Sequence, residues 1–173
     1  VLKYLAVDFD IKEEDFQKTS ANDLTERLYK EVRDTFSRKT ETIAKQAFPV
    51  IKNVFEQRGE MFKNIVVPFT DGKRAYNVVA NLEKTYRSEG EELIRAYEKS
   101  IMLAHIDDAW KEHLREMDDL KQSVQNATYE QKDPLLIYKF ESFNLFKSMV
   151  DKLNKNVVYT LMKGQIPFDA PEE

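Results

Sequence analysis

Two long amphipathic segments joined by a short polar loop constrain the fold of this chain most. In the first segment apolar side chains recur at intervals of three or four residues, which draws one apolar stripe along a helix. The stripe consists of Leu103, Ile106, Trp110, Leu114, Met117, Leu120 and Val124. Charged residues occupy the other faces, so we predict a half-buried helix over about 88–124.

The second segment begins with a strong helix-start signal. Asp133 is a good N-cap, and Pro134 fits the first helical position, where its missing N–H costs nothing. Gly164 followed by Pro167 provides the stop. The apolar stripe between them is Leu136, Phe140, Phe143, Phe146, Val150, Leu153, Val157 and Leu161. We therefore predict a second helix over 134–163.

So short a connection predicts that the two helices pack antiparallel as a hairpin. At about 1.5 Å per residue, an arm of roughly 28 residues reaches about 40 Å. The loop at 125–133 is therefore the place where we expect contact with another molecule. We predict a structural core for the hairpin from its large apolar residues, which are Trp110, Leu114, Met117, Phe140, Phe143 and Phe146. An aromatic stripe could instead bind substrate, but helical spacing favours core packing.

The first half of the chain mixes helices with one β-hairpin. Ser20 is a capping residue for a helix that we expect to reach Phe48, where Pro49 allows a bend or a restart. The Asp71-Gly72 pair between the β-rich runs at 65–69 and 75–79 predicts a hairpin.

Two details of this half are also predicted. Pro68 indicates an edge strand or a bulge. Either Asn81 or Ser88 opens the long helix that follows. The fold class is thus mainly α: an elongated helical bundle with a long antiparallel two-helix hairpin and a small inserted β-hairpin. We divide the chain into a segment 1–87, a helical hairpin 88–167 and a tail 168–173.

Composition and charge exclude several classes of function. A net charge of −4 with both signs interspersed gives no basic face for nucleic acid. The sequence has no run of about twenty apolar residues and no cysteine, so it predicts neither a membrane span nor disulfides. Because the chain begins at Val1 and ends in Glu172-Glu173, we interpret it as a piece of a larger protein.

Residues with catalytic or metal-binding chemistry are sparse. The sequence contains no Gly-x-x-x-x-Gly-Lys phosphate loop, so we expect no nucleotide site in this chain. His105 and His113 lie eight residues apart without further ligands in a metal-binding pattern, which favours surface or satisfied packing roles. The Asp107-Asp108 and Asp118-Asp119 doublets are typical of a solvated helix face. We predict no catalytic, cofactor or metal residues here.

The hairpin sequence resembles a known family. WKEHL at 110–114, YEQKDP at 129–134 and YKFES at 138–142 are similar to the C-terminal helical region of SecA, the ATP-driven motor of bacterial preprotein export. The likeness is almost continuous over 91–167 and weaker before it. The resemblance implies that 88–167 is the two-helix finger of the helical scaffold domain and that the preceding segment belongs to the helical wing domain.

The resemblance also implies roles and partners. Tyr129 matches the finger-loop aromatic that contacts the translocating chain, and Lys132 lies in the same matched loop. The implied partners are an unfolded secretory preprotein, a SecYEG-type channel and the parent's own motor domains. ATP and Mg²⁺ are expected in those motor domains, whose hydrolysis the finger regulates. The implied location is the cytoplasm, peripheral at the inner face of the plasma membrane.

One departure from the family and two competing functions bear on this interpretation. The segment 48–80 is longer and less helix-like than the wing expected from the resemblance, which indicates an insert. A purely structural bundle bracing the motor is one competing function. An independent helical adaptor that binds partner helices is the other. A homodimer through surfaces exposed in the isolated piece is also expected.

Overall fold

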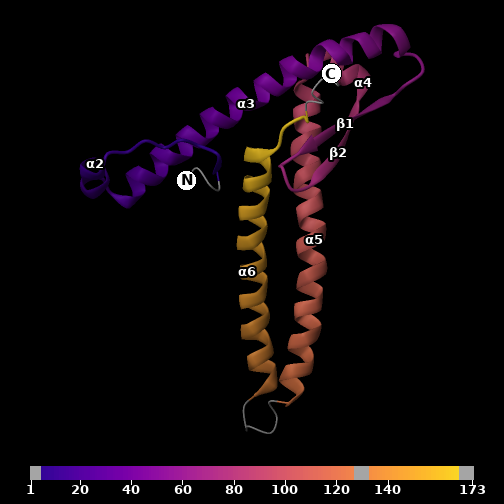
Figure 1. Cartoon of the computed structure of the whole chain (residues 1–173). Helices are drawn as coiled ribbons and strands as arrows, with labels where there is room; N and C mark the ends of the chain where they lie inside the picture. The colour runs from indigo at the N-terminus through magenta and orange to yellow at the C-terminus, as the bar shows by residue number, and fades with distance from the viewer. Residues whose placement is uncertain (1–4, 127–132, 168–173) are drawn as a thin grey trace. The chain divides into compact units, whose positions relative to one another are not determined.

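The computed structural model describes residues 5–126 and 133–167 and is mainly helical (Figure 1). The elements, in chain order, are α2 Glu13–Lys18, α3 Ala21–Arg58, β1 Asn64–Thr70, β2 Ala75–Asn81, α4 Leu82–Arg87, α5 Glu91–Asn126 and α6 Pro134–Lys163. The predicted fold class of long helices with one small β-hairpin is confirmed. No helix within the described ranges is both long and apolar enough to cross a membrane.

The chain forms two compact units. The first consists of Val1–Ser100 with Tyr159–Glu173, and the second is Ile101–Val158. Helices α5 and α6 each contribute residues to both units. The division into wing, finger and tail that the sequence suggests follows family domains rather than compactness, and it stays a prediction.

Helix α3 begins as predicted and continues past the proline. The Ser20 hydroxyl accepts a hydrogen bond from the backbone N–H of Asp23, which caps the first turn. The sequence left a bend or a restart open at Pro49, and the structure has one helix that includes Pro49 and ends at Arg58. Packing overrides the proline: Ala47 and Ile51 are both buried against the rest of the first unit. Further along, Phe55 stacks on Tyr86 of α4 at 4.3 Å between ring centroids.

The β-hairpin forms where the Asp-Gly turn predicted it. The strands β1 and β2 are antiparallel, and Gly72 takes the positive φ of 86° that the turn requires. Asp71 Oδ1 accepts hydrogen bonds from the N–H groups of Lys73 and Arg74 at 2.9 and 2.8 Å. Burial alternates along both strands, so one face of the hairpin packs inward and the other is exposed.

Pro68 lies on the outer edge of this hairpin, as predicted. On that edge Thr70 exchanges two backbone hydrogen bonds with Gln165, at 2.8 and 2.9 Å. The next hydrogen-bonded pair in the same register is Pro68 with Pro167, and neither residue has an N–H to donate. The pairing therefore stops after one bridge.

Both predicted helix starts after the hairpin are used, each for a different helix. The Asn81 side chain caps α4, and the Ser88 hydroxyl accepts from the N–H of Glu92 in the first turn of α5. Between these helices Glu89 and Gly90 have φ values of 50° and 99°, so the chain turns sharply. A Cβ at Gly90 would lie 3.1 Å from the Cβ of Ala44, because α3 passes close to the turn.

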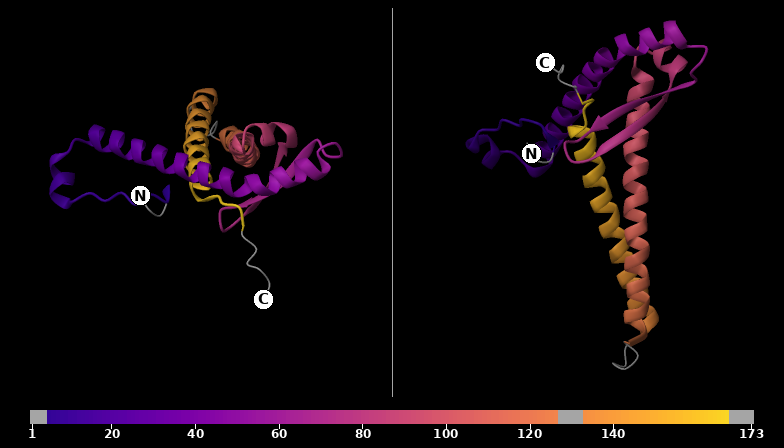
Figure 2. Two further views of the ribbon diagram at one scale, coloured as in Figure 1. Left: turned by 90° about the horizontal axis from the view of Figure 1, so that it is seen from above. Right: turned by 45° about the vertical axis from the view of Figure 1, so that its right-hand side comes forward.

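The core of the first unit lies where α3, the hairpin, α4, the start of α5 and the end of α6 meet (Figure 2). Its fully buried side chains include Val7, Phe69, Val78, Leu82, Thr85, Leu93 and Tyr97. Thr160 and Met162 at the end of α6 are also buried, so this core joins residues from distant parts of the sequence.

Candidate functional site

The arms of the helical hairpin make up the second unit, where α5 and α6 run side by side in opposite directions (Figures 1 and 2). Asp133 Oδ1 caps α6 by accepting from the N–H of Leu135 at 2.9 Å, as the sequence predicted. The loop that joins the arms contains Tyr129 and Lys132, and both lie outside the described residues. What is described is therefore the pair of helices on either side of the predicted contact loop.

The prediction of a core made by the large apolar residues of the hairpin is wrong for this chain. Five of these six side chains are about half exposed or more, and only Met117 is half-buried. The exposed five are Trp110 (48%), Leu114 (49%), Phe140 (65%), Phe143 (64%) and Phe146 (47%). We call these five residues the apolar flank.

The buried face of each helix coincides only in part with the predicted stripe. On α5, His113 and Val124 are buried, and Met117 and Leu120 between them are half-buried. The half-buried positions of α6 that recur at intervals of three or four are Tyr138, Ser142, Leu145, Met149 and Leu153. A single neighbouring helix covers only a narrow seam, whereas both helices are apolar over a wider arc. The flank therefore stays uncovered.

His113 is the polar residue of the seam. Its ring is only 6% exposed and lies between Trp110 and Phe146, at 5.6 and 5.9 Å between ring centroids. Its Nδ1 has no hydrogen-bond partner among the described residues. His113 therefore has the packing role that the sequence allowed, but its Nδ1 is unsatisfied within the described residues. His105 is half-buried and makes an interaction.

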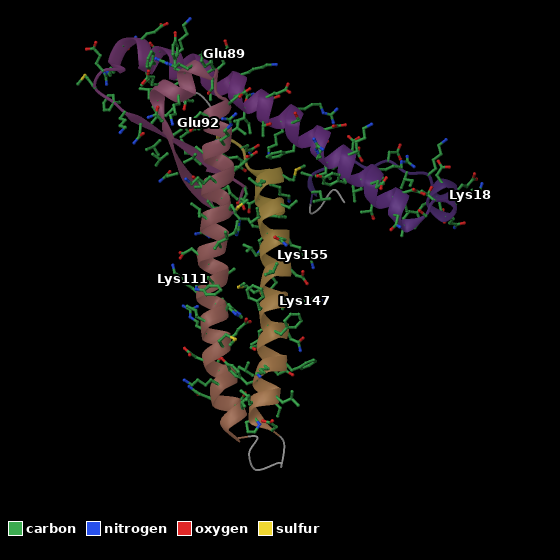
Figure 3. All side chains as sticks on the ribbon, turned by 180° about the vertical axis from the view of Figure 1, so that it is seen from behind. Lys18, Glu89, Glu92, Lys111, Lys147 and Lys155 are labelled. Carbon is green, nitrogen blue, oxygen red and sulfur yellow. The ribbon has the colours of Figure 1, made fainter. Side chains whose placement is uncertain are left out.

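Charged side chains line the outside of the hairpin arms. Figure 3 labels Lys111 on α5 and Lys147 and Lys155 on α6, and all three are exposed. Lys111 pairs with Asp107 one turn away, and this hydrogen bond raises the pKa of Lys111. No group of three or more His, Cys, Asp or Glu side chains in the described part of the chain could hold a metal ion.

The end of α6 is held in the first unit by side chains from two other helices. Lys39 Nζ on α3 donates to the carbonyl oxygens of Leu161 and Met162, at 2.9 and 2.6 Å. The hydroxyl of Tyr97 on α5 donates to the Thr160 carbonyl at 3.1 Å. We call Lys39, Tyr97 and the carbonyls of 160–162 the α6 anchor.

Burial shifts the pKa of both side chains in the α6 anchor. Desolvation lowers the pKa of Lys39 to about 8, since a charged amine is penalised away from water. Desolvation also raises the pKa of Tyr97 well above its usual value, so the phenol keeps its proton. A neutral lysine amine still has two N–H donors, which match the two carbonyls in reach.

Sequence reasoning missed this anchor. Lys39 and Leu161 are 122 residues apart, and neither belongs to a local motif. The sequence singled out only Gly164 of this region, as the residue that ends α6. The structure gives a second reason for a glycine at this position. A Cβ at Gly164 would overlap the Tyr97 hydroxyl and lie 2.8 Å from Tyr97 Cζ, so only glycine lets α6 end this close to α5.

Comparison with known proteins identifies the family. The model of the SecA Wing and Scaffold domain matches residues 3–165. The chain belongs to the SecA family. The protein translocase subunits SecA of Phocaeicola vulgatus and Bacteroides thetaiotaomicron are each 51% identical to it, over 173 and 174 residues. That of Porphyromonas gingivalis is 45% identical over 174 residues. Each match covers 100% of this chain and 16% of the relative, so the chain spans about a sixth of the length of these SecA proteins.

The segment 48–80 lies within the region that these SecA relatives match. The match to the Phocaeicola vulgatus protein is 173 residues long and covers the whole chain. In the structure this segment is the end of α3 followed by β1 and β2. Its interpretation as an insert stays a prediction.

Proposed function

We propose that this chain is the wing and two-helix finger of a SecA-type export motor, and that its loop contacts the polypeptide being exported. The observation that carries the proposal is the family match over 3–165, which includes both arms α5 and α6 and the loop between them. The role of Tyr129 follows from its position in the YEQKDP motif. Its aromatic face suits unfolded chains of any sequence, because apolar contact needs no particular partner.

The parent protein supplies the chemistry in this proposal. ATP and Mg²⁺ bind to its motor domains, and their movements reach the finger through the scaffold helices. The finger in turn regulates hydrolysis. The partners are the unfolded preprotein and a SecYEG-type channel, which places the parent in the cytoplasm at the inner face of the plasma membrane.

Crosslinking from the loop tests this proposal directly. We expect Tyr129→Cys in an otherwise cysteine-free parent to crosslink to a secretory chain stalled midway, and to do so only with ATP and the membrane channel. Lys155→Cys is the matched control, because Lys155 is exposed on the arm α6 and makes no predicted substrate contact. Equal crosslinking at both positions, or none at Tyr129, would contradict the proposal.

A bracing function is the second candidate, and the apolar flank favours it. Five large apolar side chains of the arms are each 47–65% exposed, which leaves apolar area that other parts of the parent can cover. In that case the hairpin supports the motor and its loop touches nothing mobile. Crosslinking from Phe143→Cys to the motor domains, without any from Tyr129→Cys to substrate, distinguishes bracing from substrate contact.

A further inference from the structure

The last carbonyls of α6 have an unusual set of donors. The final four C=O groups of a helix lack intrahelical partners and are generally satisfied by water or by the following backbone. Here the Thr160 carbonyl accepts from the backbone N–H of Gly164 at 2.7 Å and also from the Tyr97 hydroxyl of α5. The carbonyls of Leu161 and Met162 accept from Lys39 of α3. The end of α6 is thus bonded to both of the other long helices.

Burying the Lys39 amine at this helix end costs more free energy than leaving the helix end to water. Desolvation of the amine lowers the pKa of Lys39, so the charged form is less stable there than in water. Solvent alone could satisfy the two carbonyls without burying a lysine. This contact costs free energy and joins residues that are 122 positions apart. We therefore attribute it to the position in which it holds the end of α6, rather than to a gain in the stability of the fold.

Other contacts also hold the end of α6 in place. Phe69 of β1 stacks on Tyr97 with 4.3 Å between ring centroids, and Thr70 pairs with Gln165 just after α6 ends. Gly164 leaves the space that the Tyr97 hydroxyl occupies. The end of α6 is therefore held by α3, α5 and β1 together.

We propose that Lys39 and Tyr97 are positioning residues that tie the end of α6 to the wing helix α3, so that the two move as one body when the parent works. Helix α6 is continuous from Pro134 to Lys163, so the end that these residues hold belongs to the same helix as the arm that begins at the loop. The mechanical part of this inference, that the end of α6 and α3 move as one body, rests on the proposed function. The structural part, that Lys39 and Tyr97 hold the end of α6 against α3, does not.

The structural part is tested by hydrogen exchange in the full-length parent. Lys39→Met keeps most of the side chain and removes the amine. We expect amide exchange at Gly164 and Gln165 to become about tenfold faster, because hydrogen bonds of this kind contribute on that order. Lys45→Met is the matched control, since Lys45 is exposed on the same helix. Unchanged exchange in Lys39→Met overturns the proposal.

A disulfide tests the mechanical part. Thr70 and Gln165 form a hydrogen-bonded antiparallel pair, whose Cα atoms are typically about 5.5 Å apart, within the range of a disulfide. We expect Lys39→Met to slow ATP-driven translocation several-fold. Adding Thr70→Cys and Gln165→Cys should restore it under oxidising conditions and not under reducing ones. The parent used has no other cysteines.

The outcomes separate this inference from the proposed function. Faster exchange with normal translocation shows that the anchor does not transmit movement and overturns the mechanical part. Slow translocation that the disulfide does not restore overturns it as well, because the defect is then not one of position. A missing Tyr129 crosslink together with disulfide rescue leaves the anchor standing and removes only the substrate contact.

Discussion

His113 shows how a single residue of the seam can limit the stability of the hairpin. A buried polar atom without a partner costs about 1–3 kcal/mol. Phenylalanine has a similar ring shape, keeps the contacts with Trp110 and Phe146, and removes the unsatisfied Nδ1. We therefore expect His113→Phe to stabilise this chain by about 1 kcal/mol, measured by guanidinium unfolding followed by circular dichroism.

The half-buried His105 on the same helix provides the comparison for that prediction. His105→Phe removes an interaction that His105 makes and should leave stability unchanged or lower it. If His113→Phe lowers stability as much as His105→Phe does, the Nδ1 of His113 is satisfied in solution and the prediction is wrong.

The lowered pKa of Lys39 predicts that its contribution to the stability of the chain depends on pH. Its pKa is lowered to about 8 in the folded chain, against 10.5 for an ordinary lysine. Between these values the unfolded chain binds more protons than the folded one, so the contribution of Lys39 to stability rises with pH. We expect Lys39→Met to be more destabilising, relative to the unsubstituted chain, at pH 9.5 than at pH 7.5. A difference that shrinks with pH would show that the pKa of Lys39 is not lowered.

The residues that sequence reasoning placed correctly act through neighbours in the chain. Ser20, Asp71 and Asp133 each bond to a backbone N–H within three residues, so their roles are readable from a short window. Lys39 and Tyr97 act on carbonyls 63 or more residues away. No local pattern could reveal those contacts.

At the scale of elements, the continuity of α3 through Pro49 is the informative departure from the sequence. A proline inside a helix removes one backbone hydrogen bond and typically costs about 3 kcal/mol. Pro49 is itself exposed, so replacing it loses little packing. We therefore expect Pro49→Ala to stabilise the chain by about 1–3 kcal/mol, measured by the same guanidinium unfolding.

Pro134 is the matched control for that substitution. It occupies the first position of α6, where its fixed φ is favourable and no N–H is needed. Pro134→Ala should be neutral or slightly destabilising. Stabilisation of similar size at both positions would mean that the effect is not specific to the helix interior.

The first and last residues of α5 and α6 were easier to predict from the sequence than the side of each helix that is buried. Helix α6 spans Pro134–Lys163, as the capping and stop signals predicted, and α5 ends two residues beyond the predicted 124. The buried seam of α6 includes Leu145 and Met149 rather than Phe143 and Phe146. Because α6 is apolar on more than one side, periodicity identifies a helix but not which side meets its neighbour.

At the scale of the whole molecule, the sequence predicted exposed surfaces in the isolated piece but did not predict that the apolar flank is one of them. The same aromatic residues that predicted a core are exposed in this chain. The relatives are about six times longer than the matched region. An apolar surface of this kind is a site of association in isolated chains.

We therefore expect the 173-residue chain to self-associate as its concentration rises, seen by sedimentation velocity. Its single tryptophan, Trp110, lies in the apolar flank and should become less accessible to acrylamide quenching at the same concentrations. Phe143→Glu places a charge in the flank and should weaken association about tenfold or more, since burying an unpaired charge is unfavourable. Asn144→Glu adds the same charge at the neighbouring exposed position and should have little effect. Association that weakens equally in both variants would reflect net charge alone, and the flank would then not be the contact surface.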